Sequence, residues 1–148
     1  MNSTGPSLTF GVDIFMSKFE EVVERIFQED PSYDRAAYEF VRQGLNFTLK
    51  YLDKKGLRKG GGHISGQQLL EGLRLFTLEQ FGPLSLTVLD FWNIRSCRDF
   101  GSIVFKLVDH GVLGKTESDS IDDFGNGYDF HEAFARPFEP HLSLGSSK

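Results

Sequence analysis

The sequence predicts a mainly α fold in a single domain, 1–148, and three observations support this. Apolar residues recur at the three- and four-residue spacing of amphipathic helices in five segments. Residues that cap helix N-termini precede several of these segments, and glycine or proline follows several of them. The length of 148 residues is enough to bury one substantial core. We therefore expect helices packed around one core, with a small β-hairpin near the C-terminal third.

The segment 34–52 is expected to form the central helix, because it carries apolar residues on two sides. One stripe contains Tyr38, Val41, Leu45, Leu49 and Leu52, and a second stripe, about 120° around the helix, contains Ala37, Phe40, Phe47 and Tyr51. Each stripe needs a cover, and we expect the helix before this segment and the helical unit after it to provide one. A second copy of the chain is the alternative cover.

The residues before the central helix predict a helical hairpin over 13–52. Apolar residues recur at helical spacing from residue 15 to residue 28, with glutamates on the other side. Asp-Pro-Ser at 30–32 interrupts the helix, and either Ser32 or Asp34 can cap the helix that follows. Two antiparallel helices are the expected result.

A basic, glycine-rich linker is predicted at 53–62. It contains four lysine or arginine residues and ends in three consecutive glycines. Because a helix start follows, backbone N–H groups there can hold an anion. The residues of this anion-binding hypothesis are Lys59, Gly60, Gly61, Gly62 and Ser65. The Walker pattern of phosphate-binding loops is absent, so we favour a solvated linker. The ends, 1–12 and 139–148, are predicted to be flexible.

Residues 63–138 are predicted to form a winged-helix-like unit of three helices with a small β-hairpin. Helix-spaced apolar residues fill 65–81, 84–92 and 96–110. Capping boxes, in which a serine and a residue three positions later satisfy each other's backbone N–H groups, are expected at Ser65 and Ser96. The three helices in succession resemble a helix-turn-helix variant.

The β-hairpin of this unit, its wing, is predicted from the residues after the third helix. Two apolar residues at 112–113 precede an acidic loop, and residues 128–130 alternate in character. A helical bundle followed by a plain acidic loop is the alternative. A last short helix is expected at 131–138, where apolar residues can dock on the core.

Several motifs that run along nearly the whole chain carry a resemblance to a known family. They are Asp30-Pro31-x-Tyr33, Ala37-Tyr38-x-Phe40-Val41, His63-Ile64-Ser65-Gly66-Gln67-x-Leu69-Leu70-Glu71-Gly72, Phe81-Gly82-Pro83, Asp99-Phe100-Gly101-x-Ile103-Val104-Phe105 and Tyr128-Asp129-Phe130-x-x-Ala133-Phe134. In this order, the motifs resemble an uncharacterised bacterial family of conserved hypothetical proteins of the Planctomycete–Verrucomicrobial type. The resemblance covers residues 17–138. It implies no activity and transfers no site.

Charge and hydropathy limit the classes of partner. The formal net charge is −5. Residues 1–62 contain 9 Lys or Arg and 9 Asp or Glu, residues 63–113 contain 4 and 5, and residues 114–148 contain 3 and 7. A nucleic-acid binder usually presents a basic face, so nucleic acid is not an expected partner. No apolar run approaches the roughly 18 residues of a membrane span, and residues 1–10 lack signal-peptide features. We expect a soluble, cytoplasmic protein without membrane contact.

No catalytic residue, metal site or cofactor is predicted. The Asp-Phe-Gly triplets at Asp99 and Asp123 lack the accompanying motifs of a kinase, and the four histidines lack metal-ligand spacing. The acidic loop does not match an EF-hand. Cys97 is the single cysteine and is interpreted as a small packing residue. Glu71 and His63 are the one acid/base pair to consider.

The favoured function is a non-enzymatic protein-interaction domain with a protein partner, monomeric, with a homodimer as the alternative. Fifteen phenylalanines exceed what helix packing needs, and surplus aromatic surface is typical of a partner site. One alternative function is a DNA-binding regulator that uses the helix 96–110, and another is a small enzyme or anion-binding protein that uses the loop and helix start at 60–71. The candidate partner-binding residues are Arg95, Arg98, Ser102 and Lys106.

Overall fold

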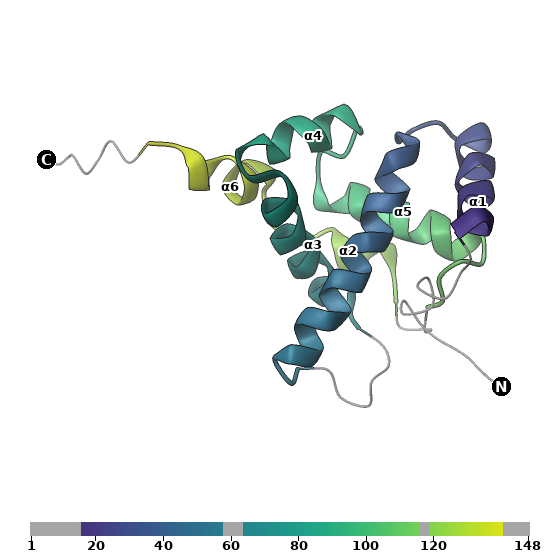
Figure 1. Ribbon diagram of the computed structural model, residues 1–148, viewed down its shortest axis with the longest axis horizontal. Helices are drawn as coiled ribbons and strands as arrows, with labels where there is room; N and C mark the ends of the chain where they lie inside the picture. The colour runs from purple at the N-terminus through teal and green to yellow at the C-terminus, as the bar shows by residue number, and fades with distance from the viewer. Residues whose placement is uncertain (1–15, 58–63, 116–118, 141–148) are drawn as a thin grey trace, which may run out of the picture.

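The structure, a computed structural model, describes residues 16–57, 64–115 and 119–140 as a helical assembly (Figure 1). Its α-helices are α1 (Met16–Glu29), α2 (Arg35–Lys54), α3 (Gly66–Phe81), α4 (Ser85–Phe91), α5 (Cys97–Asp109) and α6 (Phe130–Phe134). Short 3-10 helices, η2 (Gly82–Leu84), η3 (Ile121–Phe124) and η4 (Arg136–Phe138), lie between or after them. The predicted mainly helical fold is confirmed.

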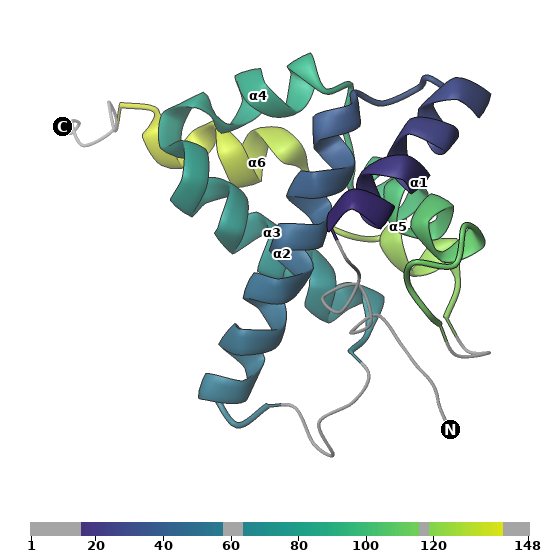
Figure 2. The ribbon, with the colours of Figure 1, turned by 45° about the vertical axis from the view of Figure 1, so that its right-hand side comes forward.

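Helix α2 is the central element, with α1 and α5 on one side and α3 on the other (Figures 1 and 2). Its first predicted stripe is buried in the main core together with apolar residues of α1, α3 and α5. Asp34 caps the helix, because its side chain accepts a hydrogen bond from the backbone N–H of Ala36 at 2.9 Å. The C-terminal end of α2 projects away from the other helices (Figure 2).

Small residues let α2 and α3 approach closely. A Cβ on Gly72 of α3 would lie 1.8 Å from Thr48 Oγ1, and a Cβ on Gly44 of α2 would lie 2.4 Å from Leu73 Cδ2. The buried hydroxyl of Thr48 donates to the carbonyl of Gly44 at 2.7 Å, so the close contact leaves this polar group satisfied. The two glycines therefore fix how near the two helices lie.

Both predicted capping boxes are present. The Ser65 hydroxyl accepts from the backbone N–H of Gln68 at 3.0 Å, and the Ser65 N–H donates to Gln68 Oε1 at 2.9 Å. Ser96 and Asp99 make the same reciprocal pair at the start of α5. These pairs satisfy N–H groups that a helix start leaves without an internal partner.

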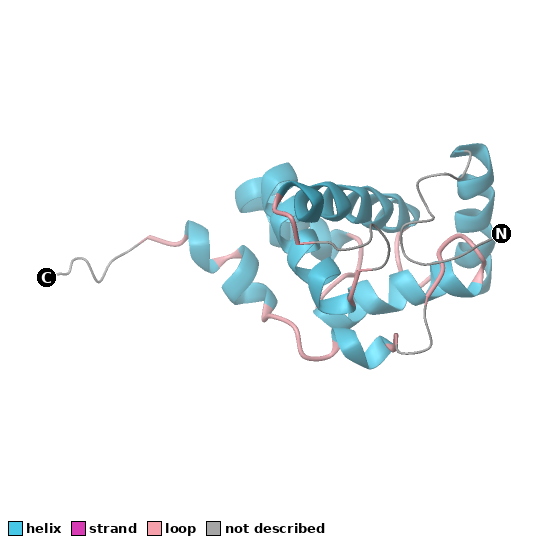
Figure 3. Ribbon diagram, turned by 90° about the horizontal axis from the view of Figure 1, so that it is seen from below, coloured by secondary structure: helices cyan, strands magenta, loops and turns pink. Residues whose placement is uncertain are grey.

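The predicted wing, and with it the winged-helix-like unit, is wrong, because the described residues contain no β-strand (Figure 3). Residues 119–130 instead form η3 and the start of α6. Phe124 is buried, and the glycines at 66 and 101 leave room for its ring on α3 and α5. Asp129, expected in a strand, caps α6 by accepting from the backbone N–H of Glu132 at 3.0 Å.

Other predicted segments fall partly outside the description. The hairpin is present as α1 and α2, and the end helix 131–138 is present as α6 and η4. Residues 58–62 of the predicted linker, and most of the two predicted flexible ends, lie outside the described residues. Among the helices that the structure describes, none combines the length and the apolar character needed to cross a bilayer.

Candidate docking surface

Six aromatic rings from α2, α3 and the residue after α4 form a continuous series, here called the aromatic face. Its members are Phe40, Phe47, Tyr51, Phe76, Phe81 and Trp92. Ring centroids lie 5.0 Å apart for Phe40 and Phe76, 5.2 Å for Phe47 and Phe76, and 5.1 Å for Phe40 and Trp92. Such separations are typical of favourable aromatic contacts. Two residues of the second stripe of α2, Phe40 and Phe47, are thus in contact with rings of the later part of the chain.

Burial differs along the aromatic face. Phe40 and Phe76, in its middle, are 4% and 8% exposed and lie outside the main core cluster. Phe47 and Tyr51, at the C-terminal end of α2, are only partly buried, and their rings stack at 6.3 Å with an interplanar angle of 9°. The cover that α3 provides therefore stops short of the end of α2. Two parallel rings remain accessible there.

A hollow of about 640 Å³ lies beside these two rings. It is lined by Phe47, Lys50, Tyr51, Asp53 and Lys54. Positions 47, 50, 51 and 54 share one side of a helix, because residues three and four apart are neighbours on its surface. The hollow thus combines two aromatic rings with two ammonium groups and one carboxylate, that of Asp53.

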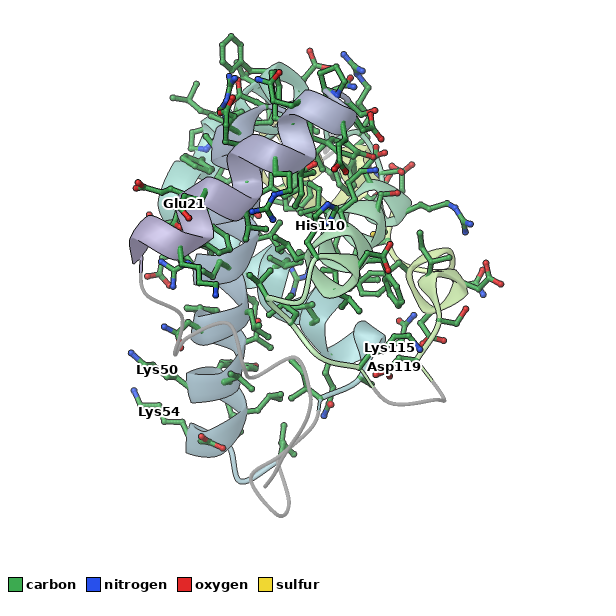
Figure 4. All side chains as sticks on the ribbon, turned by 90° about the vertical axis from the view of Figure 1, so that its right-hand side faces the viewer. Glu21, Lys50, Lys54, His110, Lys115 and Asp119 are labelled. Carbon is green, nitrogen blue, oxygen red and sulfur yellow. The ribbon has the colours of Figure 1, made fainter. Side chains whose placement is uncertain are left out.

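The lysines around the hollow face solvent. Figure 4 shows Lys50 and Lys54 pointing away from the helices, and both residues are exposed. Among the described residues neither lysine makes an ion pair with a carboxylate. The Nζ atom of Lys55 lies 5.6 Å from the ring centroid of Tyr51, within the range of a cation–π contact. The C-terminal end of α2 therefore presents basic and aromatic side chains together on the surface.

Of the five residues in the anion-binding hypothesis, the structure describes only Ser65. Ser65 is the N-cap of α3, and the capping box occupies both its hydroxyl and its N–H group. Lys59, Gly60, Gly61 and Gly62 lie outside the described residues. At the start of α3, the N–H and hydroxyl groups of Ser65 are therefore already engaged within the chain and not directed at an anion.

The two predicted partner-binding arginines, Arg95 just before α5 and Arg98 in its first turn, are paired with carboxylates of the same chain. Arg95 Nε donates to Asp90 Oδ1 at 2.8 Å, and Arg98 Nη1 lies 3.3 Å from Asp122 Oδ1. Both pairs are exposed, so each contributes little to stability. In each pair the carboxylate still balances the charge of the arginine. The two arginines therefore add no net positive charge of the kind that binds nucleic-acid phosphates.

The other two predicted residues of α5 hold the turn between α1 and α2. Lys106 Nζ donates to Asp30 Oδ2 at 2.7 Å, and this bond, with a second one from Ser32, lowers the pKa of Asp30 to about 2. Ser102 is hydrogen-bonded to the Tyr33 hydroxyl, whose pKa is raised to about 12 by burial and by the neighbouring Asp99. These side chains face the protein's own turn, so the four predicted residues do not form one open surface.

A second hollow, of about 490 Å³, lies between α1 and α2. Two of its three carboxylates are paired with arginines, since Arg35 Nε donates to Glu24 Oε1 at 2.6 Å and Arg42 Nη2 donates to Glu39 Oε2 at 2.7 Å; the third is that of Glu20. The guanidinium of Arg35 also lies 3.9 Å from the ring centroid of Phe27. Carboxylates and arginines that already satisfy each other offer a ligand little charge to neutralise.

The described residues with catalytic potential are used structurally. Burial raises the pKa of the Cys97 thiol, and the thiol donates to the carbonyl of Tyr128 at 3.3 Å, so Cys97 is not activated as a nucleophile. Glu71 is paired with Arg74 at 2.5 Å, while His63 lies outside the described residues. In the part of the chain that the structure describes, no three His, Cys, Asp or Glu side chains gather as a metal site would require.

The chain matches no protein-family model, no curated protein and no solved structure. Its resemblance to an uncharacterised bacterial family therefore stays a prediction. Sequence reasoning found the aromatic stripe of α2 but missed the rings that extend it from α3 and from Trp92. It also missed the signal at 47, 50, 51 and 54, where aromatic and basic residues alternate on one helix side.

Proposed function

We propose that the protein is a non-enzymatic protein-interaction domain that binds a partner polypeptide on the aromatic face. The observation that carries the proposal is the partial exposure of this series: buried rings at Phe40 and Phe76 continue into the partly accessible rings of Phe47 and Tyr51 at one end, and Phe81 and Trp92 at the other end are partly buried too. Partly buried aromatic side chains held by a rigid neighbour lose little entropy on binding, and they dominate the energetics of many interfaces.

The continuity of the aromatic face separates it from other exposed apolar residues. Phe91 is 77% exposed and Leu84 is 62% exposed, yet neither belongs to the series of ring contacts. Isolated apolar side chains are common on protein surfaces. A ring that is anchored by a buried ring has a fixed position, and a fixed position is what a specific partner requires.

Selection from a random peptide library tests the proposal. The intact protein is immobilised, bound peptides are enriched, and their affinities are measured for the parent and for Phe47→Ala. We expect the variant to bind at least about tenfold more weakly, because an accessible anchored ring is the expected hot spot of the interface. Circular dichroism of the variant confirms that it remains helical.

Phe91→Ala is the matched control, because it removes a more exposed phenylalanine that lies outside the aromatic face. We expect its affinities to stay within about twofold of the parent. A selection that enriches no peptide sensitive to Phe47→Ala would contradict the proposal. Equal losses for the two variants would contradict it as well, because they would indicate nonspecific apolar adsorption.

A further inference from the structure

We infer that the partner segment is acidic, with carboxylates that pair with Lys50 and Lys54 and an apolar side chain that packs on Phe47 and Tyr51. This inference rests on the proposed function and adds the chemistry of the partner. The hollow of about 640 Å³ places the two stacked rings beside two ammonium groups that pair with no carboxylate of the described residues.

The two lysines of this hollow are among the described cations that pair with no described carboxylate. Seven described lysine and arginine side chains make ion pairs with carboxylates of the chain: Arg35, Arg42, Arg74, Arg95, Arg98, Lys106 and Arg136. Lys50 and Lys54 make none with a described residue, although the chain carries a net charge of −5. Lys18, Arg25 and Lys55 are also without a described ion pair, but none of them lines the hollow.

The helix dipole accounts for only part of this basic end. Cations in the last turn of a helix are favoured by the partial negative charge of its C-terminus, and the effect falls off within that turn. This explains Lys54, which lies in the last turn of α2. Lys50 lies one turn earlier, where Asp53, three residues on, attracts it and Lys54, four residues on, repels it. An external anion between the two ammonium groups would remove the repulsion.

The two rings of Phe47 and Tyr51 indicate the kind of side chain that lies next to the carboxylates in the partner segment. Phe47 and Tyr51 stack nearly parallel, so together they offer one apolar strip along the helix. A leucine or aromatic side chain of the partner can lie across that strip while a flanking glutamate or aspartate reaches a lysine. An amphipathic acidic segment, with carboxylates three or four residues apart on a helix, matches the spacing of Lys50 and Lys54.

The library selection described above tests the inference when it is repeated on two charge variants of the intact protein. These are Lys50→Glu/Lys54→Glu and Lys50→Ala/Lys54→Ala, each checked for its helical spectrum. From the parent we expect acidic peptides with apolar residues, whose affinity falls as sodium chloride is raised. We expect these peptides to bind about tenfold or more weakly to the glutamate variant, which should instead select peptides without an acidic bias.

The outcomes separate the inference from the proposed function. Peptides that depend on Phe47 but carry no acidic bias would overturn the acidic partner and leave the proposed function intact. A selection without any peptide dependent on Phe47 would overturn both. Tighter binding of a fluorescent single-stranded oligonucleotide than of the acidic peptides, lost on Lys50→Glu/Lys54→Glu, would overturn the inference in favour of nucleic acid. Sedimentation showing a dimer that Phe47→Ala dissociates would overturn it in favour of a second copy.

Discussion

The two apolar sides of α2 differ in how completely the rest of the chain buries them. On one side, Tyr38, Val41 and Leu45 are at most 1% exposed and belong to the main core with α1 and α5. On the other side, Phe40 is buried by rings of α3 and by Trp92, whereas Phe47 and Tyr51 remain partly open. The same helix thus contributes a closed, mostly aliphatic side and an aromatic side that is partly open toward its C-terminus.

This difference shows how stability and recognition are divided along one helix. The closed side supplies burial, which stabilises the fold roughly in proportion to the apolar area removed from water. The open side is anchored by the same packing but leaves rings and lysines for another molecule. Substitutions on α2 are therefore expected to affect stability near the middle of the aromatic face and binding near its end.

The largest expected effect comes from Phe40→Ala, which removes the ring that joins the aromatic face. Phe40 is 4% exposed and contacts Phe76, Phe81 and Trp92, so its loss leaves a cavity. We expect the free energy of unfolding to fall by about 3–5 kcal/mol. Urea denaturation followed by circular dichroism measures the change.

Phe47→Ala is the matched control for this prediction. Its ring is partly exposed, so we expect a loss of only about 1 kcal/mol. Similar losses for the two variants would show that the aromatic face is closed along its whole length, and the division between stability and recognition would then be wrong.

The second prediction concerns the contact that holds α3 against α2. In Gly72→Ala the new Cβ would lie 1.8 Å from Thr48 Oγ1, so the helices must separate. Alanine favours the helix by about 1 kcal/mol, but overpacking costs more, and we expect a net loss of about 1–2 kcal/mol. Thermal or urea unfolding of the variant measures it.

A double-mutant cycle with Thr48→Ala sharpens this prediction. Removing the hydroxyl and methyl of Thr48 relieves the nearest clash and one at 2.6 Å while the Cβ of residue 48 stays, so Gly72→Ala should cost less, though not nothing, in that background. Strictly additive costs would mean that the close approach of the two helices does not limit the position of α3.

Much of the fold could be predicted from local sequence. The two stripes of α2 follow from spacing along one helix, and the capping boxes at Ser65 and Ser96 need only four consecutive residues each. The wing failed because three alternating residues at 128–130 are too few to specify a strand when Asp129 can cap a helix instead. The burial of Phe124 depends on glycines at positions distant in sequence, which periodicity does not reveal.

The candidate site was less accessible to sequence reasoning, because it is assembled from three parts of the chain. Phe40 lies 36 residues from Phe76 and 52 from Trp92, and nothing in their local patterns indicates that the rings meet. The basic, aromatic side at 47–54 was readable from helical spacing alone. What the sequence did not show is which cations are already paired within the fold.

The third prediction concerns the hydrogen bond between Lys106 of α5 and Asp30, in the turn between α1 and α2. Asp30→Asn removes the carboxylate that accepts from Lys106 at 2.7 Å. Because 44% of the Asp30 side chain is exposed, solvent screens the pair and we expect a loss of about 0.5–1 kcal/mol at neutral pH. The folded pKa of Asp30 is about 2 against an ordinary 3.8, so the carboxylate stabilises the fold above pH 3.8.

The pH dependence checks this assignment. As pH falls from 3.8 toward 2, Asp30 is protonated and its contribution is lost, so the parent and Asp30→Asn should converge in stability. Urea unfolding at a series of pH values measures the difference. Lys106→Met should reduce the difference at neutral pH to the part that comes from the bonds with Ser32, and a difference that persists unchanged at pH 2 would mean that the bond to Lys106 is not its source.

The smallest expected effect on stability comes from Lys50→Glu, and it is the most informative about the open end of α2. The new glutamate gains an attractive neighbour in Lys54, four residues on, and a repulsive one in Asp53, three residues on. Each interaction is worth about 0.2–0.5 kcal/mol, so their opposition should leave stability within about 0.5 kcal/mol of the parent. Urea denaturation measures the stability of the variant. We expect its affinity for an acidic peptide to fall. A loss above about 1 kcal/mol would exceed such surface effects and show that Lys50 supports the fold, which would remove the main reason to assign it to a partner.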